Sequence, residues 1–178
     1  MSITLRDSRA EDIAAITAIY GHAVRTGLAS FEYDPPDIAE MTRRRDAVLA
    51  GAFPYLVAID QAGTVLGYSY ASTYRARIGY RFAVENSIYV AADAHGRGIG
   101  HALLRELIAR CTAQGHRLMV AVIGDSANAA SIGLHAACGF QPAGTLRNVG
   151  WKHGQWVDSV FMTLPLGEGA TTPPPAGR

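Results

Sequence analysis

The sequence is poor in several features that would assign a protein to a particular class. It has two cysteines in 178 residues, Cys111 and Cys138, and a net charge of only +1. No run of 18 uncharged apolar residues occurs, and charges interrupt the first sixteen residues, where a secretory signal would need an apolar core. A nearly neutral charge disfavours electrostatic binding of nucleic acid. We therefore expect a cytoplasmic protein without membrane or nucleic-acid partners, whose cysteines are buried free thiols rather than a redox pair.

Three kinds of ligand-binding motif are also missing. The six histidines show neither His-x-x-x-His spacing nor an acidic partner at ligand spacing, so we expect no metal site. No Gly-Lys-Ser/Thr occurs, which disfavours an ATP-type phosphate loop. The dinucleotide pattern Gly-x-Gly-x-x-Gly fails because its third glycine falls on His101, and no acidic residue follows at a distance of about 20 residues.

The composition that is present describes one ordinary globular unit. Apolar residues make up 49% of the chain and charged residues 17%, which is typical of a folded domain with a substantial core. We expect a single domain over residues 1–166. The remaining residues, 167–178, end in a segment rich in Pro and Thr and are predicted to form a disordered tail.

Hydrophobic periodicity predicts an alternation of strands and helices. In its later half helices cross between neighbouring strands, which indicates a mixed α/β sheet. The predicted order is a strand at 2–6, a helix from 9–12 onward, a loop at 27–36, a helix at 37–50, strands at 55–60, 65–74 and 80–90, a glycine turn and helix, a strand at 118–123, a helix capped by Asp125 or Ser126 and ended by Gly139, and strands at 140–149 and 155–164.

The most informative stretch runs from Ala83 to Gln114. A β-rich segment is followed by a glycine cluster, Gly96, Gly98 and Gly100, which opens directly into an amphipathic helix. The free N–H groups and the dipole of a helix N-terminus favour an anion, and glycines allow close approach to the main chain. This predicts a phosphate or pyrophosphate site, with a plain tight connection as the alternative.

The same stretch carries a family resemblance. The segment His95-Gly-Arg-Gly98-Ile-Gly100 resembles the acyl-CoA motif Q/R-x-x-G-x-G/A of the GCN5-related N-acetyltransferases (GNAT), although His95 replaces the Gln or Arg. The segment from Asn128 to Gly139-Phe140 resembles the later helix of that family. Three further blocks, at 84–90, 120–124 and 150–158, are similar to those of the phosphinothricin and methionine sulfoximine acetyltransferases. The resemblance covers roughly residues 3–165.

The resemblance implies a fold and a co-substrate. The expected fold is a GNAT-type mixed, mostly antiparallel central sheet flanked by helices, whose strands at 80–90 and 118–123 splay apart to admit the pantetheine arm of acetyl-CoA. The strand end and the glycine turn would bind this molecule through main-chain groups, with a hydrogen bond from Asn128, whose alternative role is to cap its helix. The implied contacts are Tyr89, Val90, Ala91, Arg97, Gly98, Ile99, Gly100, His101, Ala102 and Asn128.

Acetyl transfer to an amine needs a base, because an α-amino group with a pKa of about 7.7 to 8.0 is mostly protonated at neutral pH. Glu85 interrupts an apolar strand and shares a face with Ser87 and Tyr89, so it is either a solvated edge residue or a carboxylate whose pKa is raised by partial burial. The resemblance implies the second, as base or through a water. For His135 it implies a base partner or a general acid for the CoA sulfur, with a structural histidine as the alternative.

The acceptor pocket is expected to contain Phe31, Arg75, Arg77, Tyr80 and Ser87. The two arginines lie close together and could bind an amino-acid carboxylate bidentately, although surface arginines commonly have no such role. Phe31 matches a substrate-facing aromatic residue of the related enzymes, with a core position as the alternative.

The sequence therefore predicts an acetyl-CoA-dependent N-acetyltransferase for a small amino-acid-like amine such as phosphinothricin, methionine sulfoximine or methionine sulfone. Direct attack in a ternary complex is favoured, because neither cysteine has a neighbouring charge that would activate it for an acyl-cysteine route. The relatives imply a homodimer. The alternatives are another acceptor, such as a polyamine, an aminoglycoside or a protein N-terminus, and an acyl-CoA-binding sensor without turnover.

Overall fold

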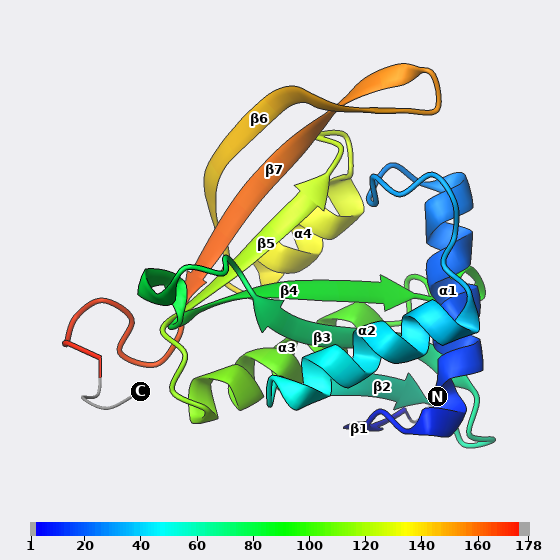
Figure 1. Cartoon of the computed structure of the whole chain (residues 1–178), viewed down its shortest axis with the longest axis horizontal. Helices are drawn as coiled ribbons and strands as arrows, with labels where there is room; N and C mark the ends of the chain where they lie inside the picture. The colour runs from blue at the N-terminus through cyan, green and yellow to red at the C-terminus, as the bar shows by residue number, and fades with distance from the viewer. Residues whose placement is uncertain (1–2, 175–178) are drawn as a thin grey trace.

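The computed structural model describes residues 3–174, which form one seven-stranded sheet flanked by helices (Figure 1). The sheet order is β1-β2-β3-β4-β5-β7-β6, and among these residues β4 and β5 form the only parallel pair. The predicted mixed, mostly antiparallel fold is confirmed. The elements are β1 (Thr4–Asp7), η1 (Ala10–Asp12), α1 (Ile13–Thr26), α2 (Ile38–Ala50), β2 (Tyr55–Ile59), β3 (Val65–Thr73), η2 (Ile78–Tyr80), β4 (Ala83–Val90), η3 (Ala92–Ala94), α3 (Ile99–Ala113), β5 (Leu118–Gly124), α4 (Ala129–Ala137), β6 (Gln141–Lys152) and β7 (Gln155–Pro165).

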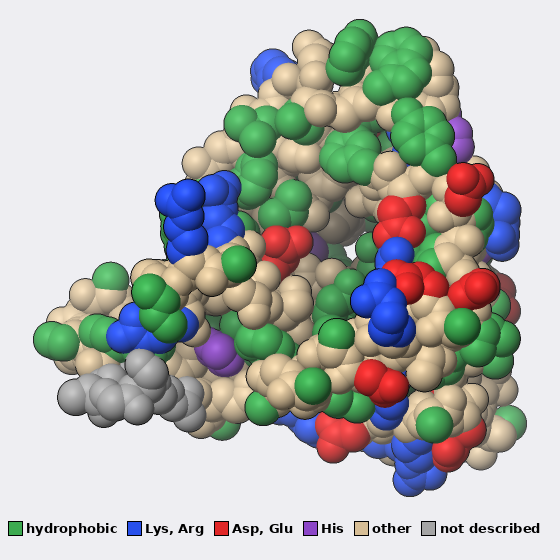
Figure 2. Space-filling view, in the orientation of Figure 1, with side chains coloured by type: hydrophobic (Ala, Val, Ile, Leu, Met, Phe, Trp, Pro, Cys, Tyr) green, Lys and Arg blue, Asp and Glu red, His purple; other side chains and the backbone are tan. Residues whose placement is uncertain are grey.

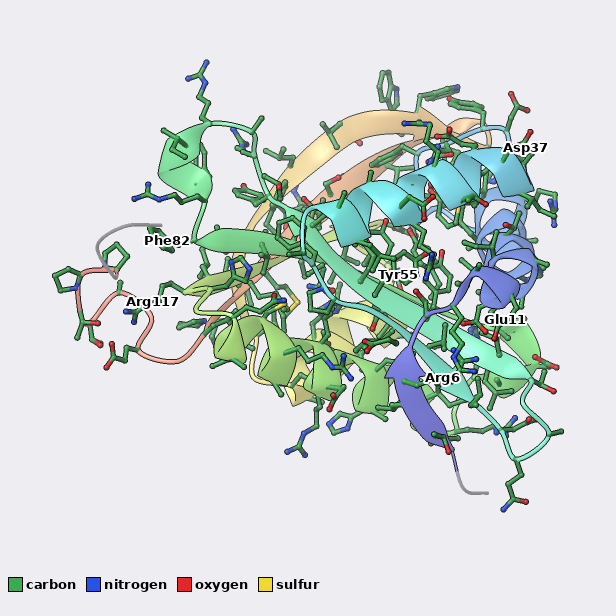
Figure 3. The ribbon with its side chains drawn as sticks, turned by 60° about the horizontal axis from the view of Figure 1, so that its bottom comes forward. Arg6, Glu11, Asp37, Tyr55, Phe82 and Arg117 are labelled. Carbon is green, nitrogen blue, oxygen red and sulfur yellow. The ribbon has the colours of Figure 1, made fainter. Side chains whose placement is uncertain are left out.

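The two faces of the sheet carry separate apolar clusters. Helices α1 and α2 cover one face, where Ile16 and Met41 pack with Tyr68. Helix α3 covers the other face with Leu103, Leu104 and other buried residues. Strand β4 serves both clusters because successive side chains point to opposite faces. Figure 3 shows α2, which begins after the cap Asp37, lying across the strands that include Tyr55.

The parallel strands β4 and β5 are paired over only half of β4. Their register runs from Ala83 opposite Leu118 to Asn86 opposite Ala121, and beyond that point β5 continues its pairing with β7 alone. The pair begins where the Arg117 N–H donates to the Phe82 carbonyl at 2.8 Å, at the end of the sheet labelled in Figure 3. The predicted splay is therefore present, and it opens the sheet beside residues 87–90.

Several predicted boundaries differ from the structure. The strand predicted from Tyr80 begins at Ala83, because the 3₁₀ turn η2 occupies Ile78–Tyr80. The predicted cap of α4 at Asp125 or Ser126 is wrong: the Asn128 side chain accepts from the Ser131 N–H at 3.1 Å. Strand β6 reaches Lys152 instead of ending at 149, so the last two strands form a long hairpin.

Two predicted segments, at the two ends of the chain, extend beyond the described residues. The predicted strand start at Ser2 and the last four residues of the predicted tail, 175–178, lie outside the described residues. Within the tail, Glu168 forms an ion pair with Arg117 at 3.1 Å and turns follow it. Among residues 3–174, no helix combines the length and apolarity needed to cross a bilayer. Cys111 is buried, Cys138 is partly buried, and both are free thiols.

Candidate active site

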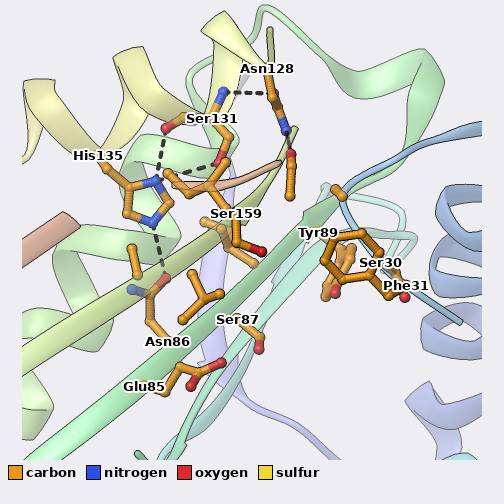
Figure 4. A pocket seen from close by; sticks show the side chains of 16 residues that line it. Ser30, Phe31, Glu85, Asn86, Ser87, Tyr89, Asn128, Ser131, His135 and Ser159 are labelled. Carbon is orange, nitrogen blue, oxygen red and sulfur yellow. Dashed lines mark hydrogen bonds between the residues drawn. The ribbon is translucent and has the colours of Figure 1, made fainter. Parts of the chain in front are cut away.

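A cavity of about 250 Å³ lies where β4 and β5 separate (Figure 4). It passes through the opened sheet, so that residues from both faces of β4 reach it. Figure 2 shows the molecule hollowed between the β6–β7 hairpin and the side formed by α1 and α2. The lining residues are Ala29, Ser30, Phe31, Glu85, Asn86, Ser87, Ile88, Tyr89, Ala121, Val122, Ile123, Gly124, Asn128, Ser131, His135 and Ser159.

Glu85 is a carboxylate of this cavity. It lies on β4 opposite Ser72 of β3 and is partly buried, on the face that carries the α1 and α2 cluster. Burial raises the pKa of Glu85 above its usual value, because the low dielectric of the interior penalises the charged form. A carboxylate with a raised pKa that opens into a cavity is suited to accept a proton near neutral pH.

His135 lies on the opposite side of the same cavity (Figure 4). Only 2% of it is exposed, and its ring packs edge-to-face on Phe140. Its Nδ1 lies 2.8 Å from the Ser131 carbonyl oxygen, and its Nε2 lies 3.1 Å from Asn86 Oδ1. Burial lowers the pKa of His135, while the hydrogen bond to Ser131 raises it. The ring is therefore held at both nitrogens.

A second cavity, of about 400 Å³, adjoins the first at the N-terminus of α3. Gly98 caps this helix in the left-handed conformation with φ of 76°, and the first helical bond joins the Ala102 N–H to the Gly98 carbonyl at 3.0 Å. The N–H groups of residues 99–101 precede that bond and point out of the helix end. A Cβ added at Gly96 or Gly98 would meet no atom within 4 Å, so the main chain there is open to a ligand.

The two cavities share Ile88, Asn128 and Ser131. A ligand whose diphosphate lay on the α3 terminus could therefore extend its other end toward Glu85. The start of α3 can approach α4 closely because residue 100 is glycine: a Cβ there would lie 3.2 Å from the Leu134 side chain of α4. The chain thus fits an acyl-CoA at this place, with open amides for the phosphates and a slot beside the strand for the arm.

The three residues predicted to contact the pantetheine arm, Tyr89, Val90 and Ala91, differ in which of their groups are available to a ligand. The Ala91 N–H donates to the Leu66 carbonyl of the β3 end at 2.9 Å, so it is used within the sheet. Because N–H directions alternate along a strand, the Val90 N–H points to the opened side. The side chain of Tyr89 packs on Tyr20 in the α1 cluster, at 5.0 Å between ring centroids. Of the three, the Val90 N–H is placed to reach the slot.

The predicted residues of the glycine turn also differ in whether they line the second cavity. Gly98, Ile99, Gly100 and His101 line the second cavity, whereas the Ala102 N–H belongs to the helix. Arg97 is exposed on the turn. The His95 ring folds back with its Nε2 3.0 Å from the Val90 carbonyl, so the residue that departs from the family motif ties the turn to the strand end.

Only some of the residues predicted to bind the acceptor line the first cavity. Phe31 and Ser87 line the first cavity with Glu85. Arg75, Arg77 and Tyr80 are exposed on the connection between β3 and β4, where the Arg75 guanidinium lies over the Tyr80 ring at 5.8 Å from its centroid. That connection leads into β4 two residues before Glu85 is reached. These three residues therefore lie outside the cavity wall.

Four polar residues of the cavity were not predicted from the sequence: Ser30, Asn86, Ser131 and Ser159. Asn86 and Ser131 lie inside the two quoted motifs, next to Glu85 and one helical turn before His135. The helical spacing of Ser131 and His135 was the available signal. Nothing in the pattern marked Ser30 or Ser159, because they reach the cavity only through the packing of distant segments.

Lys152, the only lysine in the chain, was also missed. It is completely buried, and its Nζ donates to the Val24 carbonyl at 2.8 Å and to the Ser30 carbonyl at 2.6 Å. Burial lowers the pKa of Lys152. Since Val24 lies in the last turn of α1 and Ser30 in the following loop, the lysine fastens both to the end of β6.

The loop held by Lys152 packs closely against two glycines. A Cβ at Gly150 would lie 2.2 Å from the Phe31 ring, and one at Gly124 would lie 2.5 Å from the Leu28 carbonyl oxygen. The Tyr33 hydroxyl also donates to the Trp151 carbonyl. The loop that carries Phe31 is therefore placed by β5 and β6 rather than by its own sequence.

A parallel pair that splays beside an open helix N-terminus, with a carboxylate at the junction, suits an enzyme that transfers a group from an anionic carrier to a second substrate. The sequence profile of the Acetyltransferase (GNAT) family matches residues 18–140. The chain therefore belongs to the GNAT family of acetyltransferases.

Individual relatives are similar over nearly the whole chain. Phosphinothricin N-acetyltransferase of Alcaligenes faecalis is 54% identical over 171 residues, which cover 96% of this chain and 86% of that protein. An L-methionine sulfoximine/L-methionine sulfone acetyltransferase of Pseudomonas paraeruginosa is 45% identical, with coverage of 93% and 96%. The crystal structure of a phosphinothricin acetyltransferase from Sinorhizobium meliloti in complex with AcCoA superposes with a TM-score of 0.96 at 50% identity, covering 99% of this chain and 95% of that one.

Proposed function

We propose that the protein transfers the acetyl group of acetyl-CoA to the amino group of a small amino-acid-like substrate of the phosphinothricin, methionine sulfoximine or methionine sulfone type. The named activities of the similar proteins support this acceptor class. The observation that carries the proposal is the junction of two cavities, one open to the α3 terminus and the other lined by Glu85.

Acetyl-CoA supplies an activated thioester when it is bound. The N–H groups at the start of α3 would hold its diphosphate, and Ile88, Asn128 and Ser131 would line the passage for its arm. Asn128 already caps α4 through Oδ1, which leaves its Nδ2, 3.5 Å from the Gly124 carbonyl, as the group for a ligand contact. The Val90 N–H would stabilise negative charge on the thioester oxygen.

Glu85 would accept a proton from the ammonium form of the acceptor, directly or through a water. Burial raises the pKa of Glu85, so this pKa lies closer to the pKa of an α-amino group, about 7.7 to 8.0, than the pKa of an ordinary carboxylate does. His135 would complete the proton transfers on the other side of the cavity. No cluster of three metal-ligating side chains occurs within residues 3–174, and a metal-free reaction stays a prediction.

The acceptor itself would lie between Glu85, Ser87 and Phe31. We propose that Arg75 and Arg77, with the Tyr80 ring, meet its carboxylate at the entrance rather than inside the cavity. Their position on the segment that enters β4 supports this, and the cavity wall itself provides no lysine or arginine among the described residues.

We further propose a cytoplasmic homodimer. Two free cysteines suit a reducing compartment. Figure 2 shows apolar side chains gathered at the tip of the β6–β7 hairpin, where Val149, Trp151 and Trp156 are each about half exposed or more. Exposed apolar residues in such a group are typical of a surface covered by a second protein chain.

The proposal is tested by measuring thiol release from acetyl-CoA with a panel of amines: phosphinothricin, methionine sulfoximine, methionine sulfone, a polyamine, an aminoglycoside and a peptide with a free N-terminus. We expect turnover with the first three and loss of turnover in Glu85→Gln, while calorimetry shows unchanged CoA binding. Turnover confined to the last three would refute the acceptor class. An acetyl-CoA-binding protein that is inactive with every amine would be a sensor.

A further inference from the structure

The contacts of His135 require more protons than a neutral ring can supply. The chain of contacts runs from the Ser131 carbonyl to Nδ1 and from Nε2 to Asn86 Oδ1 (Figure 4). It continues from Asn86 Nδ2 to the Val120 carbonyl at 3.1 Å. Both ends of this chain are backbone carbonyls, which only accept. Three contacts therefore need three N–H donors, one of them from Asn86 and two from the ring.

The orientation of Asn86 does not remove this requirement. Turning its amide over would give Nε2 a donor but would set Asn86 Oδ1 against the Val120 carbonyl oxygen, so that two acceptors faced each other. A neutral imidazole has one N–H and one lone pair, which leaves one contact of the chain repulsive in every arrangement. Only the doubly protonated ring satisfies all three.

We propose that Asn86 is a positioning residue for acetyl transfer, which holds His135 as an imidazolium that supplies the proton for the departing thiolate. This inference rests on the proposed function. It chooses between the two roles that the sequence left open for His135, because a ring that already carries both protons acts as an acid and not as a base.

Burial acts against this arrangement, and the two acceptors act in its favour. Burial lowers the pKa of His135, the hydrogen bond to the Ser131 carbonyl raises it, and Asn86 Oδ1 is a second acceptor for the charged form. Around the ring, α4 contributes Ser131, β4 contributes Asn86, and the segment after α4 contributes Phe140. The titratable groups lining the same cavity are Glu85 and Tyr89, which leave β4 on its other face.

Ser131 provides the exit for the proton. Its Oγ lies 3.5 Å from His135 Nδ1, and the residue lines both cavities, where the thioester arm and the acceptor meet. The thiolate sulfur would take the hydroxyl proton of Ser131, the Ser131 oxygen would take the Nδ1 proton, and the ring would become neutral. With the neutral ring, one contact of the chain lacks its N–H donor. The His135 ring then takes up a proton from solvent and becomes an imidazolium again.

The test is an NMR titration of the ¹⁵N-histidine-labelled protein without substrate, in which the His135 signals are assigned by their loss in His135→Gln. In Asn86→Leu the apolar side chain cannot accept, and we expect the titration midpoint of His135 to fall by about 1 pH unit. Asn86→Asp places an anionic acceptor there and should raise the midpoint. Ser69→Ala, at a buried polar residue of β3 that is not among the residues lining the cavity, is the matched control and should leave the midpoint unchanged.

Activity gives the second readout. In Asn86→Leu the basic limb of kcat against pH should move down with the midpoint, while the KM for acetyl-CoA stays near the wild-type value. Asn86→Ala, a smaller side chain that also cannot accept, serves if the leucine variant does not fold. A His135 midpoint that is the same or higher in Asn86→Leu or Asn86→Ala overturns the inference even where amines are acetylated. A protein that shows the shift but acetylates no amine refutes the proposed function instead.

Discussion

Glu85 and Asn86 are neighbours in the chain, leave β4 on opposite faces, and nevertheless line the same cavity. Alternation along the strand explains the first relationship, and the separation of β4 from β5 directly after Asn86 explains the second. A continuous sheet would have isolated the two side chains from each other. The splay therefore places the Glu85 carboxylate and the amide that contacts His135 on either side of one cavity.

Glu85 should make the protein more stable in acid than at neutral pH, relative to a variant that cannot ionise. Its pKa is raised in the folded state, so its contribution to the free energy of unfolding is fully present below the unfolded value of 4.5 and is lost as pH rises through the folded value. Glu85→Gln should therefore have a higher Tm than the wild type at pH 7 and a similar Tm at pH 4, measured by calorimetry.

The matched control for that comparison is Glu11→Gln, which alters a carboxylate that is 69% exposed. Its Tm at pH 7 should stay close to the wild-type value, because an exposed ion pair contributes at most about 1 kcal/mol. A Glu85→Gln protein that is less stable than wild type at pH 7 would show that the carboxylate is stabilised by partners and not penalised by burial.

Gly98→Ala should weaken acetyl-CoA binding and cost about 1 kcal/mol of stability. The cost arises because φ at this position is +76°, where a side chain is strained, although a Cβ there would meet nothing within 4 Å. Gly98 lines the second cavity, so we expect the KM for acetyl-CoA to rise while the KM for the amine stays constant.

Gly133→Ala is the control for Gly98→Ala. Gly133 also has open space at the Cβ position, but it lies inside α4, where alanine is preferred by about 0.5–1 kcal/mol. This variant should raise the Tm and leave both KM values unchanged. Equal effects of the two substitutions on acetyl-CoA binding would remove the α3 terminus from the proposed site.

Lys152→Met should destabilise the protein by about 2 kcal/mol and raise the KM for the amine. The substitution leaves the buried carbonyls of Val24 and Ser30 without their charged donor and releases the loop that carries Phe31. Thermal unfolding and steady-state kinetics check both effects. Arg147→Met, which breaks an exposed ion pair on the same strand, should change the stability by less than about 1 kcal/mol; an equally small effect of Lys152→Met would contradict the proposed anchoring.

Gly150→Ala should act on the acceptor through Phe31. A methyl group at Gly150 would overlap the Phe31 ring, so the ring must move and the amine KM should rise while the acetyl-CoA KM does not. The double variant Phe31→Ala/Gly150→Ala should show no further loss beyond Phe31→Ala, because the clash is gone. Strict additivity of the two kinetic effects would show that Gly150 acts by another route.

Val149→Asp should separate the proposed dimer. It puts a charge on the exposed apolar tip of the β6–β7 hairpin, which a partner chain would otherwise desolvate. Sedimentation velocity should give a dimer for the wild type and a monomer for the variant, with the Tm of the monomer near that of the wild type at low concentration. A monomeric wild type would refute the proposed assembly.

The local patterns were sufficient for most of the fold. The period of the apolar residues placed the helices and strands, and the glycine cluster placed the open start of α3, because these features depend on residues close together in the chain. Predicted boundaries were wrong where several neighbouring residues could each cap a helix. At α4, Asn128 and not Asp125 or Ser126 accepts the capping hydrogen bond. The positions of Glu85 and His135 in one cavity agreed with the motifs that carry them.

Only the tertiary structure decided which other groups meet those two residues. The contact between Asn86 and His135 spans 49 positions of sequence, and that between Lys152 and Ser30 spans 122. The periodicity of the sequence does not predict contacts over such separations, because they form only when separate elements pack and buried polar groups find partners. The sequence by itself determined the frame and the open amides of α3, and packing determined the wall of the first cavity, the burial of Lys152 and the contact between Asn86 and His135.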